Sequence, residues 1–240
     1  MMATREEDHL AFADHVHHVL IAGEFILLDE KRDRYFLLDE SDSEQLLSSL
    51  VSGTISEALL KCRSAGLMAL QEKPQCINIF SSRQHGIGNH VWANVENYRR
   101  DAYGRSKFIL ALLLISCTKI WISIFGFGST VKLARRLTVR APRKEEKSSV
   151  VDSKRILQMA AAIYRAGLRF PCKIQCLESS LALYGYASLA NIRTTFKVGV
   201  QRYDFLAHAW IEIDDRVIAD DPALSIAMPT ILRIEPRLIR

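Results

Sequence analysis

Three side chains in the C-terminal part of the chain could together perform covalent catalysis by a thiol: Cys176, His208 and Asp220. A cysteine attacks as its thiolate, and the first turn of a helix favours this anion because the backbone N–H groups there lack intrahelical partners. An imidazole then serves as base and acid, and a carboxylate at its other nitrogen fixes its orientation. The sequence therefore predicts a cysteine nucleophile served by a histidine.

A second cysteine, Cys172, lies one turn before Cys176 and competes for the role of nucleophile. It directly follows Pro171, so we expect it in a loop. Cys172, Cys176 and His208 could also bind a metal ion, but the sequence offers no evident fourth ligand. Neither a metal nor a cofactor is predicted. Three histidines near the N-terminus have no cysteine or carboxylate set around them and are expected to be solvated: His15, His17 and His18.

The carboxylate has several candidates. Asp220 ends the strand expected beside that of His208, and Asp221 follows it. Because side chains alternate along a strand, a bulge would exchange these two positions. Asp214 and Asp215 lie in the turn expected between the two strands. From spacing alone, these alternatives stay open.

The elements that position these residues follow from the spacing of apolar side chains. Residues 105–137 are predicted to be helical, residues 140–149 to form an exposed loop, and a further helix to begin at Asp152. The remaining pattern predicts one helix followed by three strands: 176–189, then 193–200, 205–213 and 217–219.

The N-terminal residues carry a different pattern. Two short helices are predicted, one from Ser41 to Gly53 and one that opens with a capping box of Thr54 and Glu57. The second helix is expected to turn three apolar side chains inward: Ile55, Leu59 and Leu60. Three strands precede these helices and complete a small winged-helix-like module: 19–24, 25–30 and 35–38.

The two patterns meet in a loop-rich stretch with no clear period, where Pro74, Gly86 and Gly88 favour turns. We therefore predict an α+β protein with the winged-helix-like module over 1–75, a linker over 76–104 and a second domain over 105–240. A helix-start cysteine followed by a strand histidine and a neighbouring-strand aspartate is the order of papain-like and transglutaminase-like folds.

Charge and cysteine content narrow the classes of function. Residues 1–73 carry 14 Asp/Glu against 7 Lys/Arg, and the remainder carries 13 against 25. The acidic first part disfavours nucleic acid as a partner, because phosphate contacts need Lys and Arg. The five cysteines have no framework spacing, and the polar start MMATREEDHL lacks the apolar segment of a signal peptide. A reducing, cytoplasmic location is predicted.

Residues 108–127, FILALLLISCTKIWISIFGF, are strongly apolar. The uninterrupted apolar run ends at Lys119, short of the roughly 20 residues that a membrane-spanning helix requires. We therefore expect a buried amphipathic helix here and no membrane span.

Four segments of the last third resemble a known family: CLESSLALY at 176–184, FKVGV at 196–200, AHAWIE at 207–212 and VIAD at 217–220. They are similar, in this order, to the B protein of lasso peptide biosynthesis, a transglutaminase-like leader peptidase. The separation of 32 residues between the cysteine and the histidine and of 12 between the histidine and the aspartate match that family. The one departure is Ile211, where the family has valine. The resemblance selects Cys176 over Cys172 and Asp220 over Asp221.

The resemblance also implies a substrate and partners. The N-terminal module is similar to the element that binds leader peptides in ribosomal peptide pathways, here fused to the peptidase. The leader of a lasso precursor would add as a strand, and an ATP-dependent macrolactam synthetase of the asparagine-synthetase type would use the freed core amine. The residues implied in leader binding are Arg34, Tyr35, Phe36, Leu37, Leu38, Leu59 and Leu60.

Two other functions fit the same residues. The cysteine, histidine and aspartate also serve transglutaminase and arylamine acetyltransferase relatives, in which an amine accepts the acyl group in place of water. A non-catalytic adaptor would use the N-terminal module alone to bind the leader.

Overall fold

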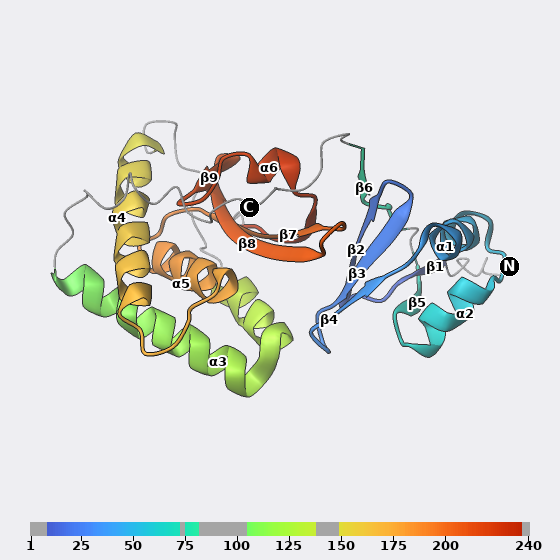
Figure 1. The fold of residues 1–240 in the computed structure, drawn as a ribbon, viewed down its shortest axis with the longest axis horizontal. Helices are drawn as coiled ribbons and strands as arrows, with labels where there is room; N and C mark the ends of the chain where they lie inside the picture. The colour runs from blue at the N-terminus through green and yellow to red at the C-terminus, as the bar shows by residue number, and fades with distance from the viewer. Residues whose placement is uncertain (1–8, 73–74, 82–104, 138–148, 237–240) are drawn as a thin grey trace, which may run out of the picture. The chain divides into compact units, whose positions relative to one another are not determined.

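The computed structural model describes residues 9–72, 75–81, 105–137 and 149–236, with the side chains of 149–153 left out of the description. The chain divides into two units, residues 1–83 and 84–240 (Figure 1). Most of the stretch predicted as a linker and most of the loop predicted over 140–149 lie outside the described residues.

The first unit is built on a hairpin whose turn the sequence pattern missed. Ala22 and Gly23 both have positive φ, at 49° and 87°, which suits the tight turn between two right-handed-twisted strands. Strands β2 and β3 flank this turn, so the first strand ends at Ile21 and not at Glu24. The four-stranded sheet has the order β4-β3-β2-β6, formed by Arg34–Leu37, Glu24–Asp29, Val16–Ile21 and Ile79–Phe80. Strand β6 lies within the predicted linker, and a second, unpredicted pair joins β1, His9–Phe12, to β5, Met68–Gln71.

Two helices follow the strands, as predicted, with different caps. Helix α1 spans Glu40–Ser52 and ends at Gly53, whose φ of 72° suits a C-cap glycine. Helix α2 spans Glu57–Ser64, and its N-cap is Ser56, whose hydroxyl accepts a hydrogen bond from the Leu59 N–H at 3.2 Å. The predicted capping box of Thr54 and Glu57 is therefore wrong, because the helix starts two residues later than that box requires.

The core of the first unit lies between the helices and the sheet. Leu59 is buried there as predicted, but Ile55 and Leu60 are 76% and 52% exposed. Ile55 precedes the helix, and Leu60 follows Leu59 by one position, which turns it away from the packed face. The buried core residues include Phe12, Val16, Leu20, Phe25, Leu27, Leu46, Ala58 and Leu67.

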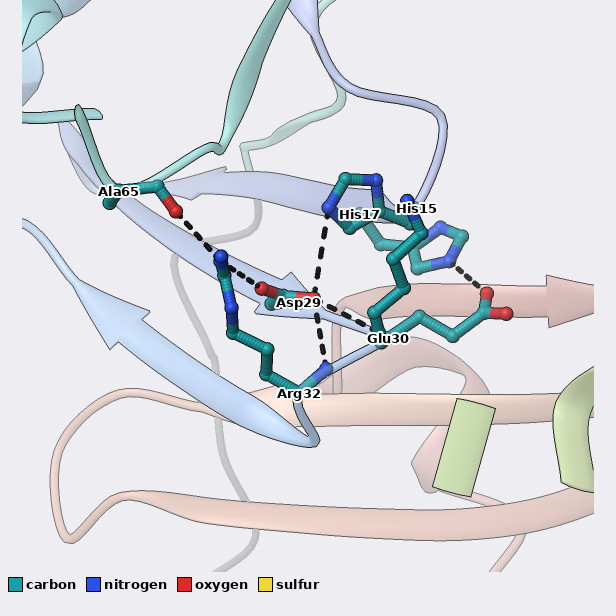
Figure 2. A network of polar contacts seen from close by, with 7 residues as sticks. His15, His17, Asp29, Glu30, Arg32 and Ala65 are labelled. Carbon is teal, nitrogen blue, oxygen red and sulfur yellow. Dashed lines mark hydrogen bonds and ion pairs between the residues drawn. The ribbon is translucent and has the colours of Figure 1, made fainter. Parts of the chain in front are cut away.

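The turn from β3 to β4 is organised by Asp29, which is fully buried (Figure 2). Its Oδ1 accepts from the backbone N–H groups of Lys31 and Arg32, and its Oδ2 forms an ion pair of 3.0 Å with Arg32 Nη1. The same guanidinium donates to the Ala65 carbonyl at the end of α2, at 2.7 Å. This network ties the start of β4 to the helical side of the unit.

The prediction that the histidines near the N-terminus are solvated is wrong. His17 Nε2 lies 2.8 Å from Glu30 Oε2, and His15 Nε2 lies 3.9 Å from Asp29 Oδ1 (Figure 2). His18 is buried and stacks on Phe12 at 4.5 Å between ring centroids. Burial lowers the pKa of His18 to about 4, so it is a neutral core residue at pH 7.

The second unit packs three helices beside a four-stranded antiparallel sheet of order β10-β7-β8-β9 (Figure 1). Helix α5 contacts α3, α4 and β8, so it lies between the other helices and the sheet. Helix α4 begins before Asp152, which therefore cannot be its N-cap. The bounds are Arg105–Leu137 for α3, Ser149–Leu168 for α4, Cys176–Leu189 for α5, Thr195–Gln201 for β7, Leu206–Ile213 for β8, Arg216–Ile218 for β9, Leu224–Ala227 for the short helix α6 and Thr230–Ile234 for β10.

Helix α3 is helical as predicted but is not the buried helix expected. Gly126, at φ 75°, interrupts it with a kink. Its most apolar window has a mean hydropathy of 2.2, yet 11% of that window is buried; by length and composition, α3 could cross a membrane. The prediction of burial fails because the helix is apolar around its whole circumference, while only one face packs against α4 and α5.

Candidate active site

Cys176 is the first residue of α5, as the sequence predicts, and is half-buried. The helix is fixed against the sheet one turn later, where the Ser180 hydroxyl donates to the Ala209 carbonyl of β8 at 2.8 Å. This bond holds the start of α5 beside His208. The first turn of α5 therefore places the thiol at the positive end of the helix dipole.

His208 and Asp220 meet at the other side of this thiol. His208 lies on β8 and is 4% exposed, and its Nε2 is 2.7 Å from Asp220 Oδ2. Nδ1 of the ring is thereby left to face Cys176, with which His208 shares a side-chain hydrogen bond. The structure brings the three predicted residues together.

A local change in backbone direction selects Asp220 over Asp221. Strand β9 ends at Ile218, and Ala219 takes a positive φ of 62°, which re-aims the next side chain toward His208. The Asp220 Oδ1 also accepts from the Asp221 N–H at 2.9 Å. Asp221 points elsewhere, since its Oδ1 accepts from the Ala223 N–H at 2.8 Å.

The remaining candidates are spread away from this site. Cys172 is exposed, and Asp214 and Asp215 form the exposed hairpin turn between β8 and β9, with φ of 48° and 60°. Among the described residues, no group of three or more His, Cys, Asp or Glu side chains is placed to hold a metal ion.

The environment favours a thiolate–imidazolium pair. Burial raises the pKa of Cys176, but the hydrogen bond and positive charge of His208, together with the backbone of Ala209 and Leu177, outweigh burial and lower it. Burial lowers the pKa of His208, but its bonds to Asp220 and Cys176 and their negative charges outweigh burial and raise it to about 9. At neutral pH the imidazole is thus protonated beside an activated sulfur.

An open cleft of about 570 Å³ leads to these three residues. Most of its lining is apolar, which suits an uncharged stretch of substrate beside the reacting bond. The apolar lining includes Ala160, Ile163, Ile174, Leu183, Leu206, Trp210 and Ile218.

Trp210 forms the floor beside His208, a role that the sequence pattern did not suggest. The two rings lie nearly parallel at 6.3 Å between centroids, and the Trp210 indole donates to Glu212 Oε1 at 2.8 Å. Glu212 is itself buried against Lys197 Nζ at 2.6 Å. Gly199 leaves room for the indole, because a Cβ there would lie 2.7 Å from the ring. The V-G-V strand segment thus serves packing behind the histidine.

Glu178 and Lys119 hold the start of α5, and sequence reasoning missed both. Glu178 is 5% exposed, and its Oε2 accepts from the Gln175 N–H at 2.8 Å, just before Cys176. Its Oε1 pairs with Lys119 Nζ of α3 at 2.7 Å. Lys119 also donates to the Lys173 carbonyl at 3.4 Å. The pair therefore clamps the loop and the helix end that carry the thiol.

We expect Glu178→Gln to destabilise the second unit by about 1–3 kcal/mol, because the buried carboxylate, which pairs with the partly exposed Lys119 ammonium, is lost. Urea unfolding followed by tryptophan fluorescence measures this unit alone. The chain has three tryptophans, Trp92, Trp121 and Trp210, and all three belong to the second unit. Glu235→Gln is the matched control. Its pair with Arg233 is also short, at 2.7 Å, but both side chains are at least half exposed, so a change of less than about 1 kcal/mol is expected. Equal effects of the two substitutions would contradict the clamp.

The residues proposed for leader binding are placed in two ways. Leu59 is buried in the core of the first unit, and Phe36 and Leu38 are partly buried against this core. Leu37 and Leu60 are 47% and 52% exposed. The other two side chains lie on β4: Arg34 is exposed and Tyr35 is partly buried.

Comparison with known proteins identifies one domain. Residues 124–232 match the family model of the transglutaminase-like superfamily, a fold generally shared by cysteine proteases and transferases that use Cys, His and Asp. Searches of curated proteins and of solved structures found no match to the chain. The matched range includes the last 14 residues of α3, strands β7, β8 and β9, the start of β10 and all three residues of the site.

Proposed function

We propose that this protein, with its transglutaminase-like domain, is a cysteine peptidase that binds the leader of a lasso peptide precursor and cleaves it from the core. The observation that carries the proposal is the assembly of Cys176, His208 and Asp220 at the end of an open, mostly apolar cleft. The segments that resemble the lasso B protein surround this assembly.

The first half of the proposed reaction uses the Cys176 thiolate and the His208 imidazolium. The Cys176 thiolate attacks the carbonyl carbon at the leader–core junction, and a C–S bond forms as the carbonyl oxygen becomes an anion. The Cys176 N–H, which as the first N–H of α5 has no intrahelical acceptor, would donate to that oxygen. The His208 imidazolium then gives its proton to the amine as the C–N bond breaks, which frees the core.

The second half regenerates the enzyme. Neutral His208 takes a proton from water, and the resulting oxygen attacks the thioester carbonyl. The C–S bond breaks, the leader leaves as a carboxylic acid, and thiolate and imidazolium are restored. Asp220 holds the imidazole ring in one orientation through both halves.

The first unit would capture the leader as an added strand. Strand β4 lies at an edge of the described sheet, and the Leu38 N–H donates back to Phe25 of β3 at 2.9 Å. Alternation along an antiparallel strand then turns the backbone of Leu37 outward, where an extended peptide can pair with it. Binding there raises the effective concentration of the cleavage site at Cys176. We further propose that this unit is a winged-helix-like module.

Leu37→Asp and Leu60→Asp should each weaken leader binding at least about tenfold, because a carboxylate replaces an exposed apolar contact. Titration of a labelled leader peptide measures the affinity, and saturating precursor should restore the wild-type kcat. Ile55→Asp is the matched control, since Ile55 is a more exposed apolar residue that is not among those proposed for leader binding. A loss of kcat at unchanged affinity would contradict leader recognition by this unit.

We also propose that the protein acts in the cytoplasm and together with a second enzyme. All five cysteines are free, and a thiolate nucleophile stays active in a reducing cytoplasm. The freed core amine is the substrate that an ATP-dependent macrolactam synthetase of the asparagine-synthetase type would join to an Asp or Glu side chain. Nucleic acid is not among the proposed partners.

The direct test is to incubate the full chain with a lasso precursor and identify the products by mass spectrometry. The peptidase yields a leader with a free carboxylate and a core with a free amine. Added primary amines distinguish acyl transfer, since a leader amide as the sole product would replace the hydrolase with a transferase. An intact precursor that is nonetheless bound would instead support an adaptor.

A further inference from the structure

Helix α3 carries an exposed apolar stripe that the peptidase proposal does not use. Ile109, Leu113, Ile120 and Ile124 are 51–66% exposed. At 100° per residue these four positions fall within about 60° of one another, over a length of about 23 Å. Trp121, 37% exposed, borders them. A contiguous row of this kind marks an interaction surface.

The stripe lies opposite the face that α3 packs into its own unit. Ala111 and Ile115 are fully buried on the packed face, and Lys119 reaches Glu178 from it. Helix α3 contacts α4 and α5, and Figure 1 shows α3 passing below α5 and crossing the lower end of α4. The packed face of α3 contacts the start of α5, which carries Cys176. If α3 crossed a bilayer, the start of α5 and Cys176 would therefore have to enter the bilayer as well. A partner must therefore approach from the side.

The net charge of the helix and of its unit indicates what that partner is. Residues 105–137 contain no Asp or Glu and six Lys and Arg, and residues 84–240 carry 24 basic against 13 acidic residues. Two stripes of a homodimer would bring these basic surfaces together, which electrostatic repulsion disfavours. An anionic lipid surface accepts the apolar side chains and the positive charge at the same time.

We infer that the α3 stripe is a membrane-surface contact: Ile109, Leu113, Ile120, Trp121 and Ile124 insert into the interface of an anionic bilayer, and the basic residues of the unit meet the phosphate headgroups. The helix lies in the plane of the interface and does not span the bilayer. The contact brings the peptidase to the membrane without a change at Cys176. It is independent of the proposed cleavage reaction.

Co-sedimentation of the full chain with vesicles tests this inference. Vesicles that contain phosphatidylglycerol should retain the protein at least about tenfold more strongly than pure phosphatidylcholine vesicles, and high salt should remove this difference. The triple variant Leu113→Ser, Ile120→Ser, Ile124→Ser should lose about 100-fold in affinity for the anionic vesicles, because about half of each apolar side chain can no longer be buried.

The matched control removes three apolar residues of similar exposure elsewhere in the same unit: Leu168→Ser, Leu189→Ser and Ile226→Ser. This variant should bind vesicles as the wild type does. Circular dichroism and thermal unfolding establish that both variants are folded. Failure of the wild type to bind anionic vesicles would overturn the inference, as would equal losses in the two variants. A dimer that the stripe variant alone dissolves would assign the surface to a second copy and overturn it as well.

Discussion

Cys176→Ala should abolish leader cleavage, with kcat reduced by at least about 10⁴-fold while leader affinity is unchanged. The methyl group cannot form the thioester, and the residual rate would come from binding and from backbone N–H groups at the start of α5. Single-turnover mass spectrometry of the precursor measures the rate, and titration with the leader measures affinity. Retained cleavage would contradict the peptidase proposal, because no other thiol faces His208 in the described site.

Cys172→Ala is the control for this experiment. Cys172 is exposed, lies four residues earlier and is absent from the cleft lining. Its loss should leave kcat within about twofold of the wild type, since surface substitutions away from a site have small effects. A thiol reagent should then still inactivate Cys172→Ala and should have no activity to remove in Cys176→Ala.

Asp220→Asn should narrow the pH range of activity and lower kcat by about 10²- to 10⁴-fold. In the wild type, protonation of the thiolate sets the acid limb of kcat/KM, and deprotonation of His208 near pH 9 sets the alkaline limb. The Asp220 carboxylate raises the His208 pKa, so its loss moves the alkaline limb to lower pH. The thiolate loses part of its positive partner, so the acid limb moves to higher pH.

Asp221→Asn separates this effect from a general disturbance of the loop. The amide oxygen of asparagine can still accept the hydrogen bond from the Ala223 N–H, so the loop keeps its shape. Both limbs of the pH profile should stay where they are in the wild type. A profile that shifts equally in the two variants would show that Asp220 acts on the backbone and not on the imidazole.

Local patterns predict much of the second unit. Helix α5 has the predicted bounds, Cys176–Leu189. The prediction succeeds because Pro171 ends the preceding helix and the apolar side chains within 176–189 repeat with the helical period, and both signals lie within a short segment of the sequence. Strands β7, β8 and β9 also lie within about two residues of their predicted positions. Strand β10 was missed, since its pairing with β7 depends on residues some 30 positions away in the chain.

In the first unit, too, local patterns predict the elements but not their tertiary contacts. Alternation and periodicity predict three strands and two helices, but they do not predict the N-cap of α2 or the burial of His18. Ser56 caps α2 in place of Thr54 because the chain leaves α1 through the left-handed Gly53 and needs three residues to turn. His18 is buried because Phe12, from a strand that the pattern missed, stacks on it.

The sequence by itself determined which residues could perform the chemistry: a cysteine at a helix start, a strand histidine and a nearby aspartate, because residue type and local periodicity are properties of short segments. The tertiary structure decided which of them meet. The positive φ of Ala219 aims Asp220 and not Asp221 at His208. The Lys119–Glu178 ion pair joins residues 59 positions apart, so no local pattern predicts it. Helix α3 is apolar on every side, so the sequence does not show which of its faces is exposed until α4 and α5 pack against the other face.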